Sequence, residues 1–335
     1  MSTHECPVVR VRLEPHPNAD RLAVAAVGGY RCVVKKDDFS DGDLAVYIPP
    51  DYCVDTKHPA FQFLGSKSRI TIRRFRGVVS DGLMLPVSAF PEHSFAEGDN
   101  ALLALGIERW EPETEGPKVG PYDAAPAPAV PLATVKFDLE ALKGFPDAIK
   151  DTDYVFVTEK IHGSNWRCCI TNDGVLHVGS HTRWLKRPSE GEPVPAHWAC
   201  LTPEFETFLR SWCAEGYVYY GEVYGASVHG AKFAYDAAPG TVRCRLFTLQ
   251  RDIGRSWLWQ SFPQFFVPLI TSGIWAEERH KVEEFVASGK SRLAEGQVAE
   301  GVVVHDYDLH GCDLPRGMSQ PGLKLICPAY YEATS

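Results

Sequence analysis

Residues 158–165 read Thr158-Glu159-Lys160-Ile161-His162-Gly163-Ser164-Asn165, and this stretch decides how the rest of the chain is interpreted. It follows Tyr154-Val155-Phe156-Val157, whose β-branched and aromatic side chains are typical of a strand. We therefore expect Lys160 to lie where this strand ends, at the mouth of a sheet. A lysine in such a place is usually a solvated surface charge, so its role depends on what the remaining sequence places beside it.

Four later segments contain charged or aromatic residues at strand ends or within strands. They are Tyr220-Gly221-Glu222-Val223-Tyr224-Gly225, Arg245-Leu246-Phe247-Thr248-Leu249, Glu300-Gly301-Val302-Val303-Val304 and Gly322-Leu323-Lys324-Leu325-Ile326. With residues 158–165 they resemble, in order, motifs I, III, IIIa, IV and V of the covalent nucleotidyltransferases, the superfamily of RNA ligases, DNA ligases and mRNA capping enzymes. The form Lys-x-His-Gly-x-Asn is most similar to RNA ligases. The resemblance covers about residues 134–328, and all five motifs in order are far more specific than the first alone.

The chemistry of such enzymes explains these residue types. A lysine amine can attack the α-phosphate of a nucleotide, form a lysyl-nucleotide and release pyrophosphate. The amine must first lose a proton, although an unperturbed lysine has a pKa of about 10.4. Nearby carboxylates such as Glu222 and Glu300 oppose that loss, so they make sense only with a divalent metal that offsets their charge. Oxygen ligands of this kind suit Mg²⁺ or Mn²⁺.

The resemblance implies a role for the residue at each motif position. It makes Lys160 the nucleophile, places Glu222 on the ribose and metal-bound water, stacks Phe247 on the base, and assigns Glu300 to the metal and Lys324 to phosphate. For Phe247 the alternative is core packing in a strand-rich segment. The catalytic set is Lys160, Glu222, Glu300 and Lys324, and the metal would be held by Glu222 and Glu300 through water.

Other residues near the motifs are candidates for nucleotide contact. Arg183 stands where the family has motif Ia, Glu159 is a candidate for recognising the adenine edge, and Asn165 for supporting the water shell of the metal. His162 is expected to be a hydrogen-bonding turn residue, because no second ligand with metal spacing supports zinc. The predicted nucleotide-binding set is Glu159, Lys160, Ile161, Asn165, Arg183, Glu222, Phe247 and Lys324.

Motif V departs from the usual pattern. These ligases commonly carry two lysines two positions apart, whereas Gly322 and Ile326 flank Lys324 at those distances. One expected phosphate contact is therefore missing. Few residues follow Lys324, so we expect no carboxy-terminal OB domain or motif VI, which are typical of DNA ligases and capping enzymes.

The first part of the sequence indicates a small β-barrel, with short strand-like runs separated by turns. Pro15-His16-Pro17-Asn18-Ala19-Asp20-Arg21-Leu22 and Arg76-Gly77-Val78-Val79-Ser80-Asp81-Gly82-Leu83-Met84 resemble segments of tRNA-binding-type OB domains. Basic residues gather between positions 67 and 76 with Phe75 among them and no acid between. This cluster is a predicted nucleic-acid-binding patch, and the alternative is a strand with solvent-facing charges. Its members are Lys67, Arg69, Arg73, Arg74 and Arg76.

Composition limits the other functional classes. The chain has 335 residues, 44% hydrophobic and 23% charged, which is ordinary for a globular protein of two domains. A net charge of -9 gives no overall basic surface, so binding of nucleic acid needs a local patch. The ten cysteines form no CxxC pair, which disfavours disulfides and structural zinc. No apolar run of about 18 residues and no signal peptide are seen, so we expect a cytoplasmic monomer without a membrane partner.

We predict an α+β fold. An OB-like β-barrel at 1–105 and a linker at 106–133, with a low-complexity Ala-Pro stretch, precede a nucleotidyltransferase domain at 134–335. That domain is expected to have antiparallel sheets with flanking helices, similar to the ATP-grasp-like core of ligases. A hairpin is expected around Asn172-Asp173-Gly174, and helices from Pro203 to before Gly216 and over residues 276–288.

The order of these domains resembles the RNA ligases typified by the Deinococcus enzyme. The resemblance implies an ATP-dependent enzyme of nucleic-acid repair that seals 3′-hydroxyl and 5′-phosphate ends, at nicks in a duplex containing RNA. Alternatives within the superfamily are a DNA ligase or a guanylyltransferase. From a different class, the chain could be a non-catalytic RNA-binding protein on an inactive ligase core, which only the missing motif V lysine supports.

Overall fold

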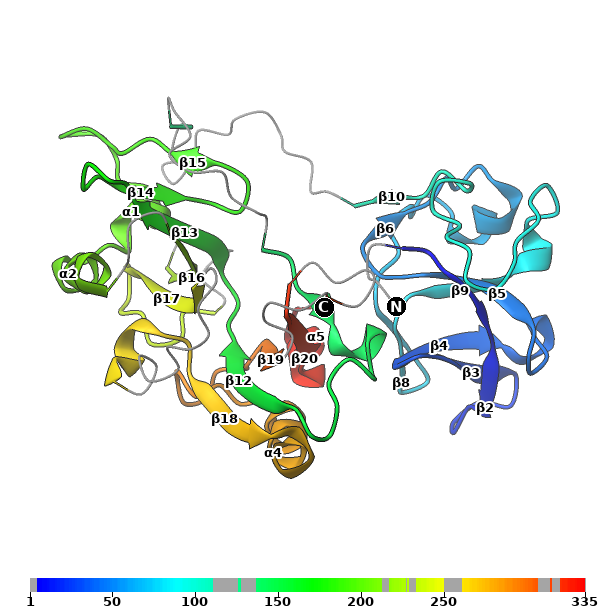
Figure 1. The fold of residues 1–335 in the computed structure, drawn as a ribbon. Coiled ribbons are helices and arrows are strands. Elements are labelled where there is room, and N and C mark those ends of the chain that lie inside the picture. The colour runs from blue at the N-terminus through cyan, green and yellow to red at the C-terminus, as the bar shows by residue number, and fades with distance from the viewer. Residues whose placement is uncertain are drawn as a thin grey trace. The chain divides into compact units, whose positions relative to one another are not determined.

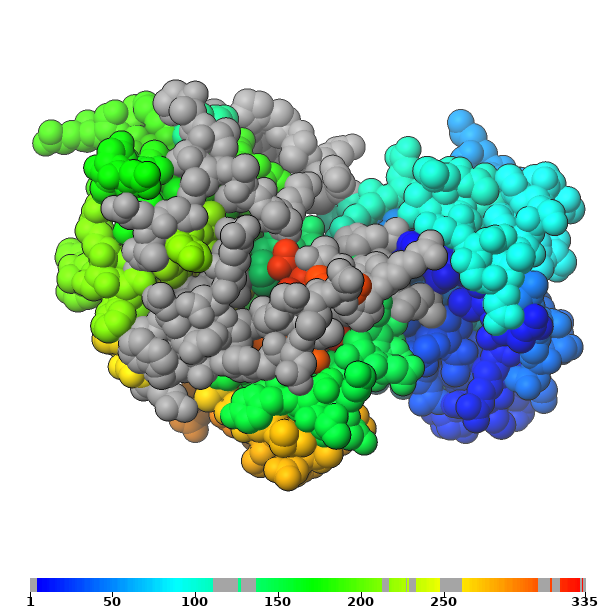
Figure 2. Space-filling model, viewed as in Figure 1, coloured from blue at the N-terminus to red at the C-terminus, as the bar shows by residue number. Residues whose placement is uncertain are grey.

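The computed structural model describes residues 5–110, 126–127, 137–212, 217–226, 228, 233–249, 261–306, 314 and 320–334. Within these ranges the chain divides into two units (Figure 1). Unit 1 comprises residues 5–110 and 140–148, and unit 2 comprises the other described residues. Figure 2 shows the blue and cyan residues of unit 1 packed into one continuous body. Most of the predicted linker lies outside the described residues.

Unit 1 is built from short antiparallel strands, as the sequence predicts. One sheet has the order β1-β5-β9 and another β2-β3-β4, while β6 pairs with β10 and β7 with β8. The strands are β1 (Val8–Arg10), β2 (Arg12–Pro15), β3 (Leu22–Val27), β4 (Tyr30–Lys35), β5 (Leu44–Ile48), β6 (Tyr52–Cys53), β7 (Arg73–Phe75), β8 (Val78–Ser80), β9 (Leu83–Pro86), β10 (Glu108–Arg109) and β11 (Glu140–Ala141). Short 3-10 turns are η1 (Lys36–Asp38), η2 (Pro59–Leu64), η3 (Val87–Ala89) and η4 (Leu142–Gly144).

The alternation of side chains explains these short strands. In β4 the exposure alternates along Tyr30–Lys35, with Tyr30, Cys32 and Val34 buried. A strand with period two buries one face, so its apolar residues stabilise the barrel core. Within the basic segment at 67–76, the strand β7 comprises only Arg73–Phe75.

Unit 2 contains two antiparallel sheets. In the first the order is β15-β14-β13-β16-β17, and in the second β20, β19, β12 and β18 follow one another. The first consists of β13 (Ser164–Ile170), β14 (Leu176–Gly179), β15 (Trp184–Leu185), β16 (Val218–Gly225) and β17 (Val242–Leu249). The strands that unit 2 contributes to the second are β12 (Tyr154–Lys160), β18 (Leu269–Ile274), β19 (Gly301–Asp306) and β20 (Gly322–Ile326).

The helices of unit 2 begin and end where local signals place them. They are α1 (Ala196–Ala199), α2 (Pro203–Trp212), α4 (Trp275–Ser288) and α5 (Pro328–Thr334), with a 3-10 turn η7 (Pro263–Phe265). Thr202 Oγ1 accepts a hydrogen bond from Phe205 N at 3.2 Å, which caps α2. Gly289, with φ of 61°, ends α4 in the left-handed conformation that favours glycine. Both predicted helices and the hairpin before β14 are present.

The two faces of the first sheet serve different purposes. One face packs against α1 and α2 in an apolar core that includes Trp166, Phe205 and Leu209. The opposite face carries Tyr220, Glu222 and Phe247, and it lines the cavity described below. The turn at 161–163 connects β12 of the second sheet to β13 of the first, so the end of β12 lies at this cavity. Among the described residues no helix is long and apolar enough to cross a membrane.

Candidate nucleotide site

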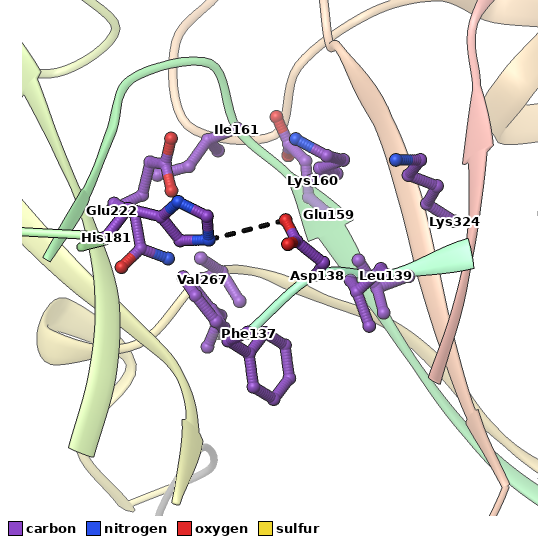
Figure 3. A pocket seen from close by; sticks show the side chains of 13 residues that line it. Phe137, Asp138, Leu139, Glu159, Lys160, Ile161, His181, Glu222, Val267 and Lys324 are labelled. Atoms are coloured by element: carbon purple, nitrogen blue, oxygen red, sulfur yellow. Dashed lines mark ion pairs between the residues drawn. The ribbon is translucent and has the colours of Figure 1, made fainter. Parts of the chain in front are cut away.

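A cavity of about 280 Å³ lies within unit 2, where strands of both sheets meet (Figure 3). Lys160 and Lys324 enter it from strands of the second sheet, while Glu222 and His181 lie on the opposite side. The structure thus brings together residues from all five predicted motif segments. The lining is Phe137, Asp138, Leu139, Glu159, Lys160, Ile161, Asn165, His181, Glu222, Phe247, Val267, Val303 and Lys324.

The predicted nucleophile is paired with a carboxylate. Lys160 Nζ lies 2.7 Å from Glu300 Oε1, and both side chains are largely shielded from solvent. Burial lowers the pKa of Lys160, but the charges of Glu300 and Glu222 outweigh it, so the pKa is raised overall. Without a counter-charge for these carboxylates, the amine therefore stays protonated and is a poor nucleophile.

Glu222 completes this group of ionisable side chains. Burial raises the pKa of Glu222 to about 8, with Glu300 adding to the increase and Lys160 and the Gly163 N–H opposing it. Position 163 must be glycine, since a Cβ there would lie 2.3 Å from the carbonyl oxygen of Val223. The close approach of the two strands allows the Gly163 N–H to meet the Glu222 carboxylate.

Asn165 and the two carboxylates offer oxygen donors that fit a hard divalent cation. Asn165 Oδ1 is buried and has no hydrogen-bond partner among the described residues. Its residue lines the cavity, so this oxygen can accept a hydrogen bond from metal-bound water. The described part of the chain contains no cluster of three or more His, Cys, Asp or Glu side chains able to hold a metal alone. Water and nucleotide phosphates would have to complete the coordination of Mg²⁺ or Mn²⁺.

An aromatic group forms another wall. The Phe137 ring centroid lies 5.3 Å from that of Phe247 and 5.3 Å from that of Tyr220. Phe247 lines the cavity and also packs against the buried cluster around Ile161. Both predicted alternatives, nucleotide contact and core packing, are therefore compatible with its position. Phe137 follows the predicted linker, and no motif in the sequence identifies it as a cavity residue.

Glu159 lies beside the nucleophile but is already engaged within the chain. Its side chain is buried, and its two oxygens accept hydrogen bonds from Ser291 Oγ at 2.6 Å and Arg292 N at 2.8 Å. Burial is the main cause that raises its pKa, while these hydrogen bonds oppose the increase. Any nucleotide group that donates to Glu159 must therefore share its oxygens with Ser291 Oγ and Arg292 N.

His181 and Asp138 are further cavity residues that motif comparison misses. His181 Nε2 lies 3.3 Å from Asp138 Oδ1, the pair drawn as a dashed line in Figure 3. Arg183, two residues later, is exposed and does not line the cavity. The residue in this segment that reaches the cavity is thus His181.

The predicted basic patch in unit 1 is only partly available. Arg73, Arg74 and Arg76 are exposed around the β7–β8 hairpin, and so is Lys67. Arg69 instead pairs with Asp51 Oδ1 at 2.6 Å and lies 3.5 Å over the ring centroid of Trp110.

The hairpin is anchored by the Pro15–Leu22 segment. His16 Nε2 lies 3.1 Å from Phe75 O, and Asn18 Nδ2 donates to Arg76 O at 2.9 Å. The side chain of Phe75 remains 41% exposed beside the arginines. An exposed aromatic ring among cations on a fixed hairpin can stack on a base while the cations meet phosphate.

These features define a class of two-domain proteins. One domain has a cavity with a buried lysine beside two acids, and the other is a barrel of short strands. Comparison with protein families gives the same division, since an RNA ligase family matches residues 153–316 and an OB-fold domain matches residues 8–87. The second part of the chain thus matches an RNA ligase family, and the first part matches an OB-fold domain. This confirms the resemblance and the α+β fold predicted from the sequence.

Solved structures show the same fold over almost the whole chain. A variant RNA ligase of Naegleria gruberi with ATP and Mn is 22% identical, with a TM-score of 0.75 over 97% of this chain and 98% of that one. Another variant of that ligase, with AMP and Mn, is 22% identical with a TM-score of 0.76 over 97% of each chain. A third structure, with PPi, is 21% identical with a TM-score of 0.74 over 97% of each chain. No curated protein matches the sequence.

Proposed function

We propose that this protein is an ATP-dependent RNA ligase that joins 3′-hydroxyl and 5′-phosphate ends through a lysyl-AMP intermediate. The observation that carries the proposal is the placement of Lys160 beside Glu300 and Glu222 in a cavity with an aromatic wall. The match of residues 153–316 to an RNA ligase family supports the reaction class. The similar structures with ATP, AMP and Mn support the choice of nucleotide and metal.

The proposed reaction consists of three transfers. In the first, Lys160 Nζ attacks the α-phosphorus of ATP, so that a P–N bond forms and the bond to the pyrophosphate leaving group breaks. In the second, the 5′-phosphate oxygen attacks that phosphorus, the P–N bond breaks, and AMP caps the 5′ end. In the third, the 3′-oxygen attacks the 5′-phosphorus and AMP leaves. Each transfer depends mainly on positioning and on neutralising charge.

The residues of the cavity divide these tasks. Glu222 and Glu300 would hold Mg²⁺ or Mn²⁺ through water, and the bound cation supplies positive charge that favours the neutral amine of Lys160. Lys324, on β20, would contact phosphate as the single lysine of motif V. Phe247 would support the base. Glu159, Asn165 and Arg183 remain proposed nucleotide contacts. Glu159 and Asn165 line the cavity, whereas Arg183 does not.

The nucleic acid would be held in part by unit 1. The exposed cations of the β7–β8 hairpin and Lys67 form a local basic patch on a protein whose net charge is -9. We propose that this patch binds the backbone of a nicked duplex that contains RNA, as part of nucleic-acid repair. Arg69 contributes less, because it is paired with Asp51.

Mass spectrometry of the intact protein with ATP and Mg²⁺ or Mn²⁺ tests the first transfer. We expect an AMP adduct that maps to Lys160, none in Lys160→Ala, and a normal adduct in Lys150→Ala, which removes an exposed lysine outside the cavity. An adduct that persists in folded Lys160→Ala contradicts the assigned nucleophile. Incubation with GTP distinguishes a guanylyltransferase, and sealing of matched RNA and DNA nicks distinguishes RNA from DNA ligase.

A further inference from the structure

Helix α5 contacts the motif I turn, residues 161–163, which directly follows Lys160 at the end of β12. Tyr330 Oη lies 2.8 Å from His162 Nδ1, a hydrogen bond between residues far apart in the chain. The same Nδ1 is 3.9 Å from Glu300 Oε2, and the other oxygen of Glu300 is 2.7 Å from Lys160 Nζ. Contacts thus run from α5 through the motif I turn to the reacting amine.

The helix is fixed at its own beginning. Cys327 N donates to Glu300 O at 2.9 Å, and Tyr330 N donates to Cys327 O at 3.1 Å. A Cβ on Gly289 would lie 2.7 Å from Ala329 Cβ, so the left-handed glycine that ends α4 lets α5 pack closely. Tyr330 is therefore attached to a rigid support that is also bonded to the backbone of Glu300.

The turn around His162 is enclosed by other rings as well. His162 N donates to Tyr235 Oη at 2.9 Å, and the Phe233 ring meets the imidazole edge-on with centroids 4.9 Å apart. These contacts fix the position of the imidazole, and Tyr330 Oη meets its Nδ1 at hydrogen-bond distance. Burial, with Glu300 and Glu222 adding to it, holds the pKa of Tyr330 well above its usual range, so the phenol keeps its proton.

We propose that Tyr330 is a positioning residue for the proposed nucleotidyl transfer, which acts by holding His162 and through it the placement of Lys160 and Glu300. Tyr330 does not line the cavity, so it acts through His162 rather than on the nucleotide. The inference rests on the proposed function of Lys160. It predicts a loss in the rate of lysyl-AMP formation with little change in ATP affinity, which a residue of the nucleotide wall would not produce.

Single-turnover formation of lysyl-AMP at varied ATP concentration tests this on the full chain. Tyr330→Phe removes only the hydroxyl, and we expect the rate at saturating ATP to fall about 10-fold, equivalent to about 1.4 kcal/mol of activation free energy, with an unchanged apparent Kd for ATP. Tyr331→Phe removes the same group from the next residue of the helix and should react at the wild-type rate. A wild-type rate in Tyr330→Phe overturns the proposal.

Substitutions of His162 extend the test to the atom concerned. An Asn side chain presents a polar atom near the place of Nδ1, whereas Gln reaches toward the place of Nε2. His162→Asn should therefore keep more activity than His162→Gln, and Tyr330→Phe should slow His162→Gln no further. If the losses of rate from Tyr330→Phe and His162→Gln multiply in the double variant, the inference is contradicted. It is also contradicted if His162→Gln keeps more activity than His162→Asn, a comparison that does not require Tyr330→Phe to fold.

The outcome also separates this inference from the proposed function. A wild-type chain that forms no adduct overturns the proposed function and with it the role of Tyr330. An adduct in the wild type that forms equally fast in folded Tyr330→Phe overturns the role of Tyr330 alone.

Discussion

Asp236 shows how one carboxylate supports the cavity from outside it. It accepts hydrogen bonds from Tyr224 Oη at 2.6 Å, Arg243 Nη1 at 2.8 Å and Arg245 Nη2 at 2.6 Å. Its neighbour Tyr235 bonds to the motif I turn, so this network connects β16 and β17 to that turn. Burial alone would raise the pKa of Asp236, but the Tyr224 hydrogen bond and the arginines outweigh it and lower the pKa.

A lowered carboxyl pKa makes stability depend on pH in a defined direction. Above the ordinary pKa the unfolded chain and the folded chain are both ionised and the full stabilisation is present, and it is lost as pH falls through the lower folded pKa. We expect Asp236→Asn to lower the free energy of unfolding by roughly 2–3 kcal/mol at pH 7, because charge-assisted bonds are lost. The deficit should shrink toward pH 3. Urea unfolding at both pH values, with the exposed Asp20→Asn as control, measures it, and a constant deficit would contradict the argument.

The sequence identified some members of the cavity and missed others. Lys160, Glu222, Lys324 and Phe247 were predicted from the resemblance to the motifs of nucleotidyltransferases, and the structure brings them to one cavity with Glu300 paired to Lys160. Phe137, Asp138 and His181 were not predicted, since their proximity depends on ring packing and on an ion pair between distant segments. Local pattern carries no information on such contacts. The roles of the predicted residues remain proposals.

At the scale of the element, the β7–β8 hairpin shows what local sequence can specify. Arg76 has φ of 48° and Gly77 φ of 88°, two consecutive left-handed residues as in a type I′ turn. The turn sequence predicts a bend, but not that the strand before it begins only at Arg73. Arg69 is withdrawn from that strand by its contacts with Asp51 and Trp110.

Substitution at this turn should separate stability from binding. Gly77→Ala places a Cβ at a φ that L-residues rarely adopt, and 3.4 Å from Asn18 Nδ2, so it should loosen the hairpin. Gly98→Ala is a matched control, because Gly98 has φ of 89° with open space around it. Both should cost about 1 kcal/mol of stability.

Affinity for nucleic acid should distinguish the two glycine variants. Gly77→Ala should bind a labelled nicked RNA duplex several-fold more weakly than Gly98→Ala, because only Gly77 belongs to the hairpin that carries the arginines. Fluorescence anisotropy at constant salt measures the difference. Equal affinity in the two variants would show that the hairpin conformation does not contribute to binding.

At the scale of the whole molecule, the sequence predicts two domains joined by a linker at 106–133. Residues 140–148 pack with unit 1 although they follow the predicted linker, and Gly29 N donates to Lys143 O at 2.9 Å. The packing of residues 140–148 with unit 1 depends on tertiary contacts, which leave no periodic pattern in the sequence. The boundaries at 105 and 133 therefore remain predictions. A deletion of residues 1–105 would remove the packing partners of residues 140–148, so surface substitutions are the better test of unit 1.

If unit 1 binds nucleic acid while unit 2 forms lysyl-AMP, substitutions in the β7–β8 hairpin should affect only the first of these two steps. Arg73→Ala with Arg74→Ala should weaken binding of nicked RNA and slow sealing, because two cations proposed to meet phosphate are lost. The slope of log affinity against log salt should fall by about 2. Lys35→Ala with Lys36→Ala makes the same change in net charge at exposed positions of unit 1 outside the hairpin. Formation of lysyl-AMP should be normal in both, since every residue that lines the cavity lies in unit 2. If both pairs weaken sealing equally, net charge rather than the hairpin controls binding. If the arginine pair also abolishes lysyl-AMP, the proposed separation between nucleotide transfer and nucleic-acid binding is wrong.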